Sequence, residues 1–184
     1  MIKDYGATFE DGTIIIVTTR DNKYLFAGSE KGYLKQICLE RREVVHDYGR
    51  INTDAITCLE TTRDSKWLIT GSHDGHVKRI SVENRQVDKD FGQVCENEIT
   101  GMKITAEGEK LFVGHGVDQL KLISLRDGQV IKDFGQVHDD QITGILISLD
   151  KKSFFTSSLD GVLKQWNYED NTLVRDHGKI IDCI

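Results

Sequence analysis

The sequence predicts an all-β fold built from four small antiparallel sheets, and three observations support this prediction. One motif recurs at equal spacing along the 184 residues, each spacing contains four short runs typical of β-strands, and the turns between the runs rely on Gly, Asp and Asn. The chain contains no proline, so these residues must supply the tight turns. A chain of this length has room for one domain with a sizeable core, and we expect a single domain over residues 1–184.

The repeat has a period of 43 residues. It is marked by an aromatic residue or His followed by Gly, at Gly6, Gly49, Gly92, Gly135 and Gly178. Three more columns keep the same spacing: Lys35, Lys78, Lys121 and Lys164; Leu25, Leu68, Leu111 and Phe154; and Thr13, Ile56, Ile99 and Ile142. The repeats therefore cover residues 7–49, 50–92, 93–135 and 136–178, and residues 179–184 are the start of a further repeat or a closing segment.

The last repeat shows its four strands clearly. We expect them at residues 142–148, 153–158, 162–168 and 172–177, with a tight hairpin turn at Asp160-Gly161. A four-stranded sheet of this size is marginal alone and must bury its faces against neighbouring sheets. A four-stranded unit with a period of about 40–45 residues is the signature of a propeller blade. The predicted fold is therefore an all-β propeller or a part of one.

The last repeat also resembles a known family. The segments GQVHDDQI (135–142) and FFTSSLDGVLKQW (154–166) are similar to the motif of WD40-repeat β-propellers, and the resemblance covers essentially the whole chain. It implies a buried hydrogen-bond chain made of His138, Thr156, Asp160 and Trp166. The sequence departs from the family pattern in two places. Two residues separate Gly135 from His138, and Asn167 stands where Asp usually follows Trp.

The other repeats have lost part or all of this polar chain. The equivalent residues in the third repeat are Cys95, Val113, Val117 and Ile123, and those in the first are Phe9, Ala27, Lys31 and Ile37. The second repeat is intermediate, with Asn52, Thr70, Asp74 and Ile80. There we expect Asn52 to stand in for the His, whereas nothing replaces the Trp indole donor. Replacing the group as a unit avoids leaving one buried polar side chain unpaired.

Four repeats leave the ring size open. The resemblance implies rings of seven blades, or sometimes six or eight. Two copies of the chain pair head-to-tail into an eight-bladed ring, or the chain is part of a larger propeller that other blades complete, or it closes a four-bladed ring alone. We expect half of an eight-bladed ring or part of a larger propeller. In either case the apolar faces of the terminal blades would be association surfaces.

Acidic residues mark the loops that lead into the first strand of each repeat. By the resemblance, these loops lie on the face that binds partners. We expect the partner-binding residues to be Glu10, Asp11, Asp54, Glu96, Glu98, Asp139 and Asp140. Such a rim would attract a Lys/Arg-rich segment of a protein partner. The alternative is that these loops are simply solvated and keep the protein soluble.

Several kinds of function are disfavoured by the sequence. The formal net charge of −6, with both signs interspersed, argues against nucleic acid or an anionic membrane as the main partner. The four cysteines show no zinc-like spacing and predict free thiols in the cytoplasm. Consecutive Ser72, His73 and Asp74 cannot form a catalytic triad, because neighbouring side chains on a strand point apart. His73, His76 and His115 would have to converge to bind a metal, and we expect no metal or cofactor.

The sequence thus predicts a non-enzymatic scaffold that mediates protein–protein interaction and associates with itself to complete a ring. The alternative is a regulatory or targeting WD40 portion of a larger multidomain enzyme.

Overall fold

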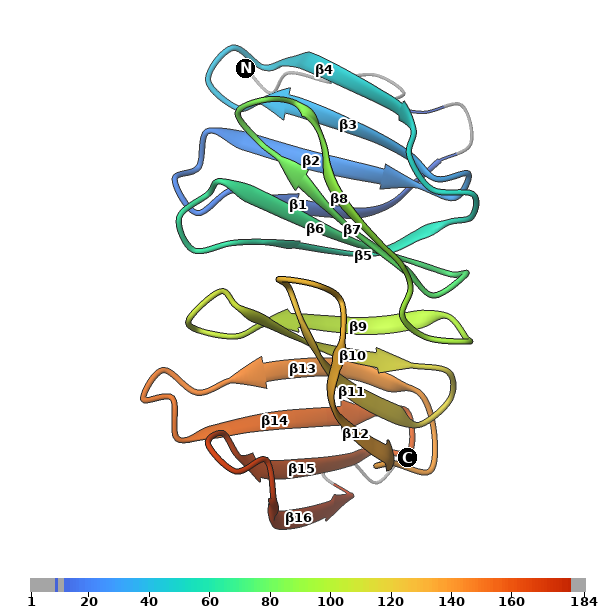
Figure 1. Ribbon diagram of the computed structural model, residues 1–184, viewed down its shortest axis with the longest axis vertical. Helices are drawn as coiled ribbons and strands as arrows, with labels where there is room; N and C mark the ends of the chain where they lie inside the picture. Colours follow the sequence, from blue (N-terminus) through green and yellow to red (C-terminus); the bar gives the residue numbers. More distant parts are fainter. Residues whose placement is uncertain (1–8, 10–11, 180–184) are drawn as a thin grey trace. The chain divides into compact units, whose positions relative to one another are not determined.

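A computed structural model of the chain describes residue 9 and residues 12–179, which form sixteen β-strands and no helix (Figure 1). Of the expected further repeat or closing segment at residues 179–184, Lys179 ends the last strand, and residues 180–184, like the candidate residues Glu10 and Asp11, lie outside the described residues. Across the described part of the chain, no helix is long and apolar enough to cross a membrane.

The strands form four sheets. The first contains β1 (Thr13–Thr18), β2 (Tyr24–Ser29), β3 (Tyr33–Cys38) and β4 (Glu43–Arg50). The second contains β5 (Ile56–Thr61), β6 (Trp67–Ser72), β7 (His76–Ser81) and β8 (Gln86–Gln93). The third contains β9 (Ile99–Ile104), β10 (Lys110–His115), β11 (Gln119–Ser124) and β12 (Val130–Gln136). The fourth contains β13 (Ile142–Ile147), β14 (Ser153–Ser158), β15 (Val162–Asn167) and β16 (Leu173–Lys179).

Each sheet is a four-stranded meander in which the strands follow one another in chain order. The paired strands are antiparallel, for example β14 with β15, where Phe154 lies opposite Trp166 and Thr156 opposite Lys164. The residues of the Thr13, Ile56, Ile99 and Ile142 column open the first strand of every sheet. The prediction of an all-β fold made of four four-stranded antiparallel blades is therefore confirmed.

Alternation along the strands explains which side chains reach the core. In β14 the sequence SFFTSS places Phe154, Thr156 and Ser158 on one face, and all three are buried. The intervening Phe155 and Ser157 are only partly buried. This alternation follows from the two-residue period of a strand, which sends successive side chains to opposite faces of the sheet.

Two kinds of turn recur in the sheets. The hairpins between the second and third strands contain Gly32, Gly75 and Gly161 at φ values of 80°, 78° and 80°, a left-handed conformation that glycine adopts without strain. The fourth strands carry an Asp-x-Gly motif in which the carboxylate accepts a hydrogen bond from the glycine N–H. The distance is 2.8 Å in each of the pairs Asp47–Gly49, Asp90–Gly92, Asp133–Gly135 and Asp176–Gly178.

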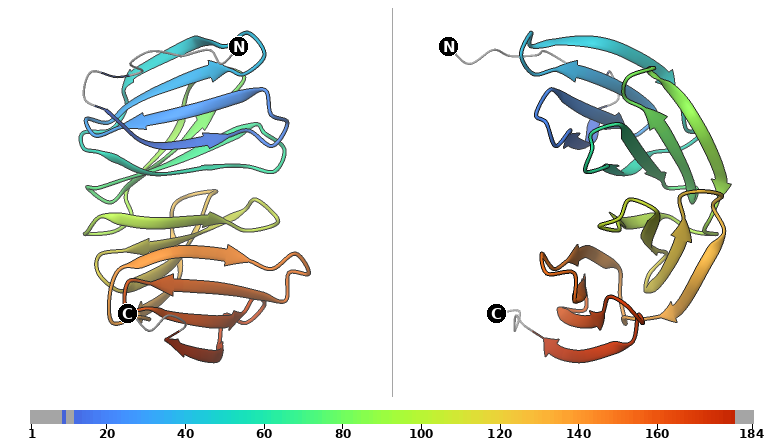
Figure 2. Two further views of the ribbon diagram at one scale, coloured as in Figure 1. Left: turned by 180° about the vertical axis from the view of Figure 1, so that it is seen from behind. Right: turned by 60° about the vertical axis from the view of Figure 1, so that its left-hand side comes forward.

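The chain divides into two compact units, the first ending at Ile99 and the second beginning at Thr100. In the first unit, the second sheet packs face to face on the first (Figure 2). Phe26 and Leu34 of the first sheet meet Ile56, Leu68 and Ile80 of the second, and all five are fully buried.

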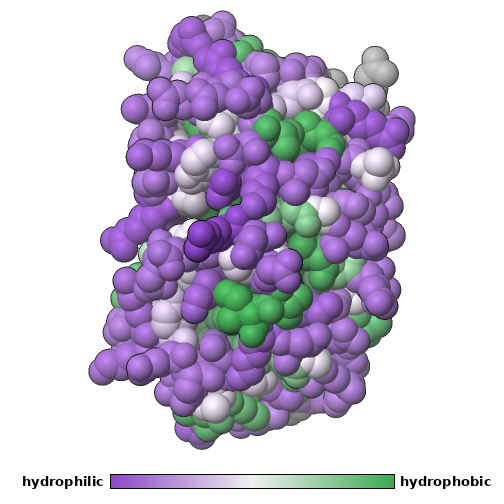
Figure 3. Space-filling model, viewed as in Figure 1, coloured by the Kyte–Doolittle hydropathy of each residue, from purple (hydrophilic) through white to green (hydrophobic). Residues whose placement is uncertain are grey.

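In the second unit, the fourth sheet packs on the third in the same manner. Phe112 and Leu120 meet Ile142, Phe154 and Trp166. The rings of Phe154 and Trp166 are stacked, with centroids 5.7 Å apart and planes 8° from parallel. The face in Figure 3, seen as in Figure 1, is mostly hydrophilic, with separate hydrophobic patches.

Candidate functional site

The turn of the fourth sheet is braced by four side chains. His138 precedes β13, Thr156 lies in β14, Asp160 lies in the hairpin after it and Trp166 lies in β15. The His138 ring contacts Asp160 Oδ2 through Nδ1 at 3.2 Å and Thr156 Oγ1 through Nε2 at 2.8 Å. Trp166 donates its indole N–H to the same Thr156 Oγ1 at 3.0 Å. The structure thus brings together the four residues that the family resemblance singled out.

The chemistry of the partners sets the direction of each hydrogen bond. Because the Asp160 carboxylate can only accept, His138 donates to it from Nδ1–H, and Nε2 is left as an acceptor for the Thr156 hydroxyl. The Thr156 oxygen in turn accepts from Trp166. Each donor is matched to an acceptor, which is the condition under which a buried polar network stabilises a fold.

Burial fixes the charge states of this group. Loss of solvent lowers the pKa of His138 below its ordinary value of 6.5, and this effect outweighs the opposing attraction of Asp160. Burial alone would raise the pKa of Asp160, but hydrogen bonds from the Asp139 and Val162 amides lie among the effects that lower it below 3.8. The brace therefore pairs a neutral imidazole with a carboxylate.

The second sheet uses its equivalent residues differently. Asn52 donates from Nδ2 to Ser72 Oγ at 2.9 Å, and Ser72 donates to Asp74 Oδ1 at 2.5 Å. Thr70, the equivalent of Thr156, is fully buried, and its hydroxyl has no hydrogen-bond partner among the described residues. Asn52 thus occupies the expected place, but it binds Ser72 and leaves Thr70 unpaired.

The third and first sheets hold apolar side chains at most of these positions. In the third sheet Cys95, Val113 and Ile123 are buried, whereas Val117 in the hairpin is 61% exposed. In the first sheet Ala27 and Ile37 are buried. Phe9 lies under the ammonium group of Lys35, which is 5.0 Å from the ring centroid.

The acidic loops of the first unit meet at one histidine. His73, in the hairpin of the second sheet, lies 3.2 Å from Asp54 Oδ2 through Nδ1 and 3.8 Å from Glu98 Oε2 through Nε2. Asp54 precedes β5 and Glu98 precedes β9, so one exposed imidazole links two successive loops. Glu96 lies on the second of these loops with an exposed side chain.

The acidic loop of the second unit is tied to the braced turn. Asp139 is exposed, and its backbone N–H donates to Asp160 Oδ2 at 3.0 Å. The carbonyl of Asp140 accepts from Ser158 Oγ at 2.8 Å, and its carboxylate accepts from the Gln141 amide at 2.7 Å. The loop is therefore held rigidly while the Asp139 carboxylate faces solvent.

The histidines singled out from the sequence do not form a metal site in the described residues. No group of three or more His, Cys, Asp or Glu side chains in residues 9 and 12–179 has the geometry to hold a metal ion. His73 is turned toward Asp54 and Glu98, and the His76 ring lies 3.2 Å from Asp74. His115 is buried, with 2% of its surface exposed.

Sequence reasoning missed the partners of the lysine column. Lys78 donates from Nζ to the Ile51 carbonyl at 2.6 Å and lies 3.1 Å from Asp90. Lys164 repeats both contacts with the Val137 carbonyl at 2.7 Å and Asp176 at 3.6 Å. Each lysine thereby fastens the segment that leaves the preceding fourth strand. The signal was present in the sequence, because Asp47, Asp90, Asp133 and Asp176 share the same 43-residue spacing.

Comparisons with known proteins agree with this geometry. The family model of the WD domain, G-beta repeat, matches residues 43–79 and 128–167. These two spans contain Asp74 and Asp160, whereas the first and third repeats have Lys31 and Val117 in that place. No curated protein matches the sequence.

Among solved structures, the chain is similar to one in a crystal structure of a mitotic checkpoint complex, with a TM-score of 0.83 and 16% sequence identity. The similarity covers 94% of this chain and 53% of that chain, so this chain spans about half the length of its structural neighbour. At this identity the similarity shows the fold alone.

Proposed function

Because the chain is a WD40-repeat protein, we propose that it is a non-enzymatic scaffold whose acidic loops bind a Lys/Arg-rich segment of a protein partner. The observation that carries the proposal is the grouping of Asp54, Glu96 and Glu98 on two successive loops of the first unit. His73 contacts two of these three carboxylates, and Glu96 is exposed on the same loop as Glu98. Carboxylates grouped on two loops of one unit attract a cationic chain and fix its register.

The described residues also support a scaffold over an enzyme. The His138–Asp160 pair is buried against Thr156 and Trp166, where its geometry serves the fold. Cys38, Cys58 and Cys95 are buried and lie outside any disulfide, and burial raises the pKa of one of them, Cys58, to about 12, which leaves that thiol unreactive. Free thiols of this kind favour the cytoplasm as the location.

The experiment is a binding titration of the whole chain with a soluble peptide of alternating Lys, Arg and Ser residues. We expect binding that weakens as salt is raised, because exposed charges are screened. Glu96→Lys/Glu98→Lys should abolish it. The matched control is Glu40→Lys/Glu83→Lys, which makes the same charge change at two exposed glutamates in the turns before β4 and β8 of the same unit. If both double variants bind the peptide as the parent chain does, the loops are only solvated and the proposal fails.

The second part of the proposal is that the chain associates with further blades to complete a propeller ring, and that a second copy supplies them. A sheet of this size needs neighbours on its apolar faces. A second candidate is a regulatory or targeting portion of a larger enzyme; that the chain spans 53% of its structural neighbour supports only the part of this candidate in which other blades belong to a longer chain. The mass of the 184-residue chain in solution separates the two, because a stable particle of 20.9 kDa would exclude self-association.

A further inference from the structure

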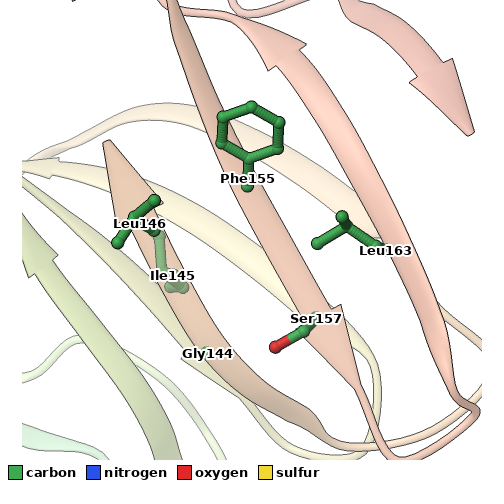
Figure 4. A pocket seen from close by; sticks show the side chains of 6 residues that line it. All are labelled: Gly144, Ile145, Leu146, Phe155, Ser157 and Leu163. Carbon is green, nitrogen blue, oxygen red and sulfur yellow. The ribbon is translucent and has the colours of Figure 1, made fainter. Parts of the chain in front are cut away.

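One face of the fourth sheet forms an apolar hollow. It has a volume of about 450 Å³ and is lined by Gly144, Ile145, Leu146, Phe155, Ser157 and Leu163. Figure 4 shows Leu146, Phe155 and Leu163 standing on three adjacent strands, with Ser157 below the Phe155 ring. Leu146 is 60% exposed. This face points away from the core of the second unit, because the alternate side chains Phe154 and Trp166 fill that core.

The same face is covered in the other sheets that can be compared. Phe26 and Leu34 of the first sheet, and Phe112 and Leu120 of the third, are the 43-residue equivalents of Phe155 and Leu163. Their exposed fractions are 0%, 0%, 1% and 0%, because the next sheet of the same unit packs on them. The hollow is therefore the face onto which a following blade would pack.

The complementary face is present on the first sheet. Ile16 is 60% exposed, whereas its equivalent Leu59 in the second sheet is 7% exposed and packs in the core. Leu25 is half-buried, whereas its equivalent Leu68 is fully buried. In the first unit Leu59 belongs to the same core as Val17, which is the equivalent of Leu146. Ile16 and Leu146 are thus the equivalents of two residues that share one core in the first unit.

One position distinguishes this uncovered face from an ordinary blade junction. The internal junctions place a glycine against the first isoleucine of the next sheet. A Cβ on Gly28 would lie 2.9 Å from Ile56 Cγ2, and one on Gly114 would lie 3.1 Å from Ile142 Cγ2. The fourth sheet has Ser157 at that position, so a following blade must lie slightly further away there than the blades at the internal junctions do. The first sheet alone begins with another residue, Thr13.

A hydrogen bond that joins the first and second sheets within the first unit can also form between two copies of the chain. Thr61 donates from Oγ1 to the Thr18 carbonyl at 2.9 Å, which links the second sheet to the first. Thr18 is the equivalent of Thr61, and it is exposed in β1. Its counterpart acceptor on the fourth sheet would be the carbonyl of Ile147.

We propose that the β13–β15 face of one chain docks onto the β1–β2 face of a second copy, with Thr13 of that copy opposite Ser157. The contact continues the blade-on-blade interface within each unit. It rests on the proposed self-association and names the surfaces that perform it. Two such head-to-tail contacts between two copies make a closed dimer.

Directed cross-linking tests the contact. A Thr13→Cys chain and a tagged Ser157→Cys chain are mixed and oxidised with glutathione disulfide. At the internal junctions the corresponding Cβ separations are 3.0 Å for Gly28–Ile56 and 3.2 Å for Gly114–Ile142, so a small outward shift of the docked sheet brings two cysteines to the Cβ separation of about 3.5–4.5 Å that a disulfide needs. We expect a covalent heterodimer from the mixture. Each variant mixed with the parent chain reports any contribution from the native cysteines and should give none. A double variant that links only within a single 20.9 kDa chain would overturn the proposal, because the chain would then close on itself.

A second pair of variants tests the same face without cysteine. Leu146→Asp should reduce the measured mass to that of one chain, because it charges the centre of the contact. Val174→Asp should leave it at twice 20.9 kDa, since Val174 is 56% exposed on the outer strand β16. Equal masses for the two variants, or no mixed disulfide, would contradict the docking model. Peptide binding by the acidic loops, measured on the same samples, reports separately on the scaffold function.

Discussion

Trp166 and Thr156 are joined by a hydrogen bond of 3.0 Å in the core of the second unit, and the same threonine oxygen lies 2.8 Å from His138 Nε2. One hydroxyl therefore satisfies a buried donor and a buried acceptor at once. The equivalent hydroxyl of Thr70, in the second sheet, has no partner among the described residues, although both threonines are fully buried.

This difference predicts opposite results from the same substitution. Thr156→Val keeps the shape of the side chain but leaves the Trp166 N–H and His138 Nε2 unpaired, so it should lower the free energy of unfolding by about 1–3 kcal/mol for each group. Thr70→Val removes a buried hydroxyl that bonds nothing, so it should be neutral or slightly stabilising. Urea denaturation of both variants beside the parent checks this. Equal losses from the two substitutions would show that the hydroxyl of Thr156 does not brace the turn.

The lowered pKa of His138 predicts sensitivity to acid. Because the folded protein holds this imidazole neutral, the unfolded chain binds a proton first as the pH falls through about 6.5. The stability contributed by neutral His138 is therefore present above pH 6.5 and is lost as the pH falls toward its lowered folded-state pKa. Denaturation midpoints between pH 7.5 and about pH 5 should fall less steeply for His138→Asn than for the parent.

A histidine on the surface provides the control for this experiment. His177 is exposed on β16, so His177→Asn should keep the steep slope of the parent. If His138→Asn and the parent lose stability in parallel over this pH range, the imidazole is not held neutral by the fold.

The loss of stability on replacing a lysine should depend on how buried that lysine is. Lys78 is 17% exposed and bonds the Ile51 carbonyl at 2.6 Å. Lys78→Met should lower the free energy of unfolding by about 1 kcal/mol, because a part-buried carbonyl loses its donor. Lys23 forms an ion pair with Asp21 at 3.5 Å with 71% of its side chain exposed, so Lys23→Met should change stability by less than about 0.5 kcal/mol. Thermal unfolding of the two variants should separate them, and a larger loss from Lys23→Met would contradict the reasoning.

The fold could be predicted from the sequence because the repeat is unbroken. The spacing of one column placed the first residue of β5, β9 and β13, and the alternation in residues 153–158 placed the buried face of β14. The strand starts follow the 43-residue repeat and the buried face of β14 follows the two-residue alternation, and both periods can be read directly from the sequence.

The hydrogen-bond and ion-pair partners of side chains were harder to predict, because they depend on the length of each side chain and on which loops lie close together in space. Asn52 was expected to replace a histidine, and it occupies that place, yet its shorter side chain bonds Ser72 and not Thr70. The bridge from His73 to Asp54 and Glu98 joins residues of two repeats whose proximity no spacing reveals. The spacing therefore located the acidic residues in these loops, whose role in binding stays a prediction, but it did not locate the imidazole that links Asp54 and Glu98.

Gly75 and Gly92 have similar backbone conformations in different surroundings, so they predict different costs for one substitution. Their φ values are 78° and 72°, and an alanine at either site is strained by about 1–2 kcal/mol. A Cβ on Gly75 would lie 2.0 Å from the Cys95 carbonyl oxygen, whereas one on Gly92 meets nothing within 4 Å. Gly75→Ala must displace the loop that carries Glu96, so it should lose more stability than Gly92→Ala and also weaken binding of the basic peptide. Unfolding curves and peptide titrations of both variants test this together. Normal peptide binding by Gly75→Ala would show that the loop is not held in place by its close approach to Gly75.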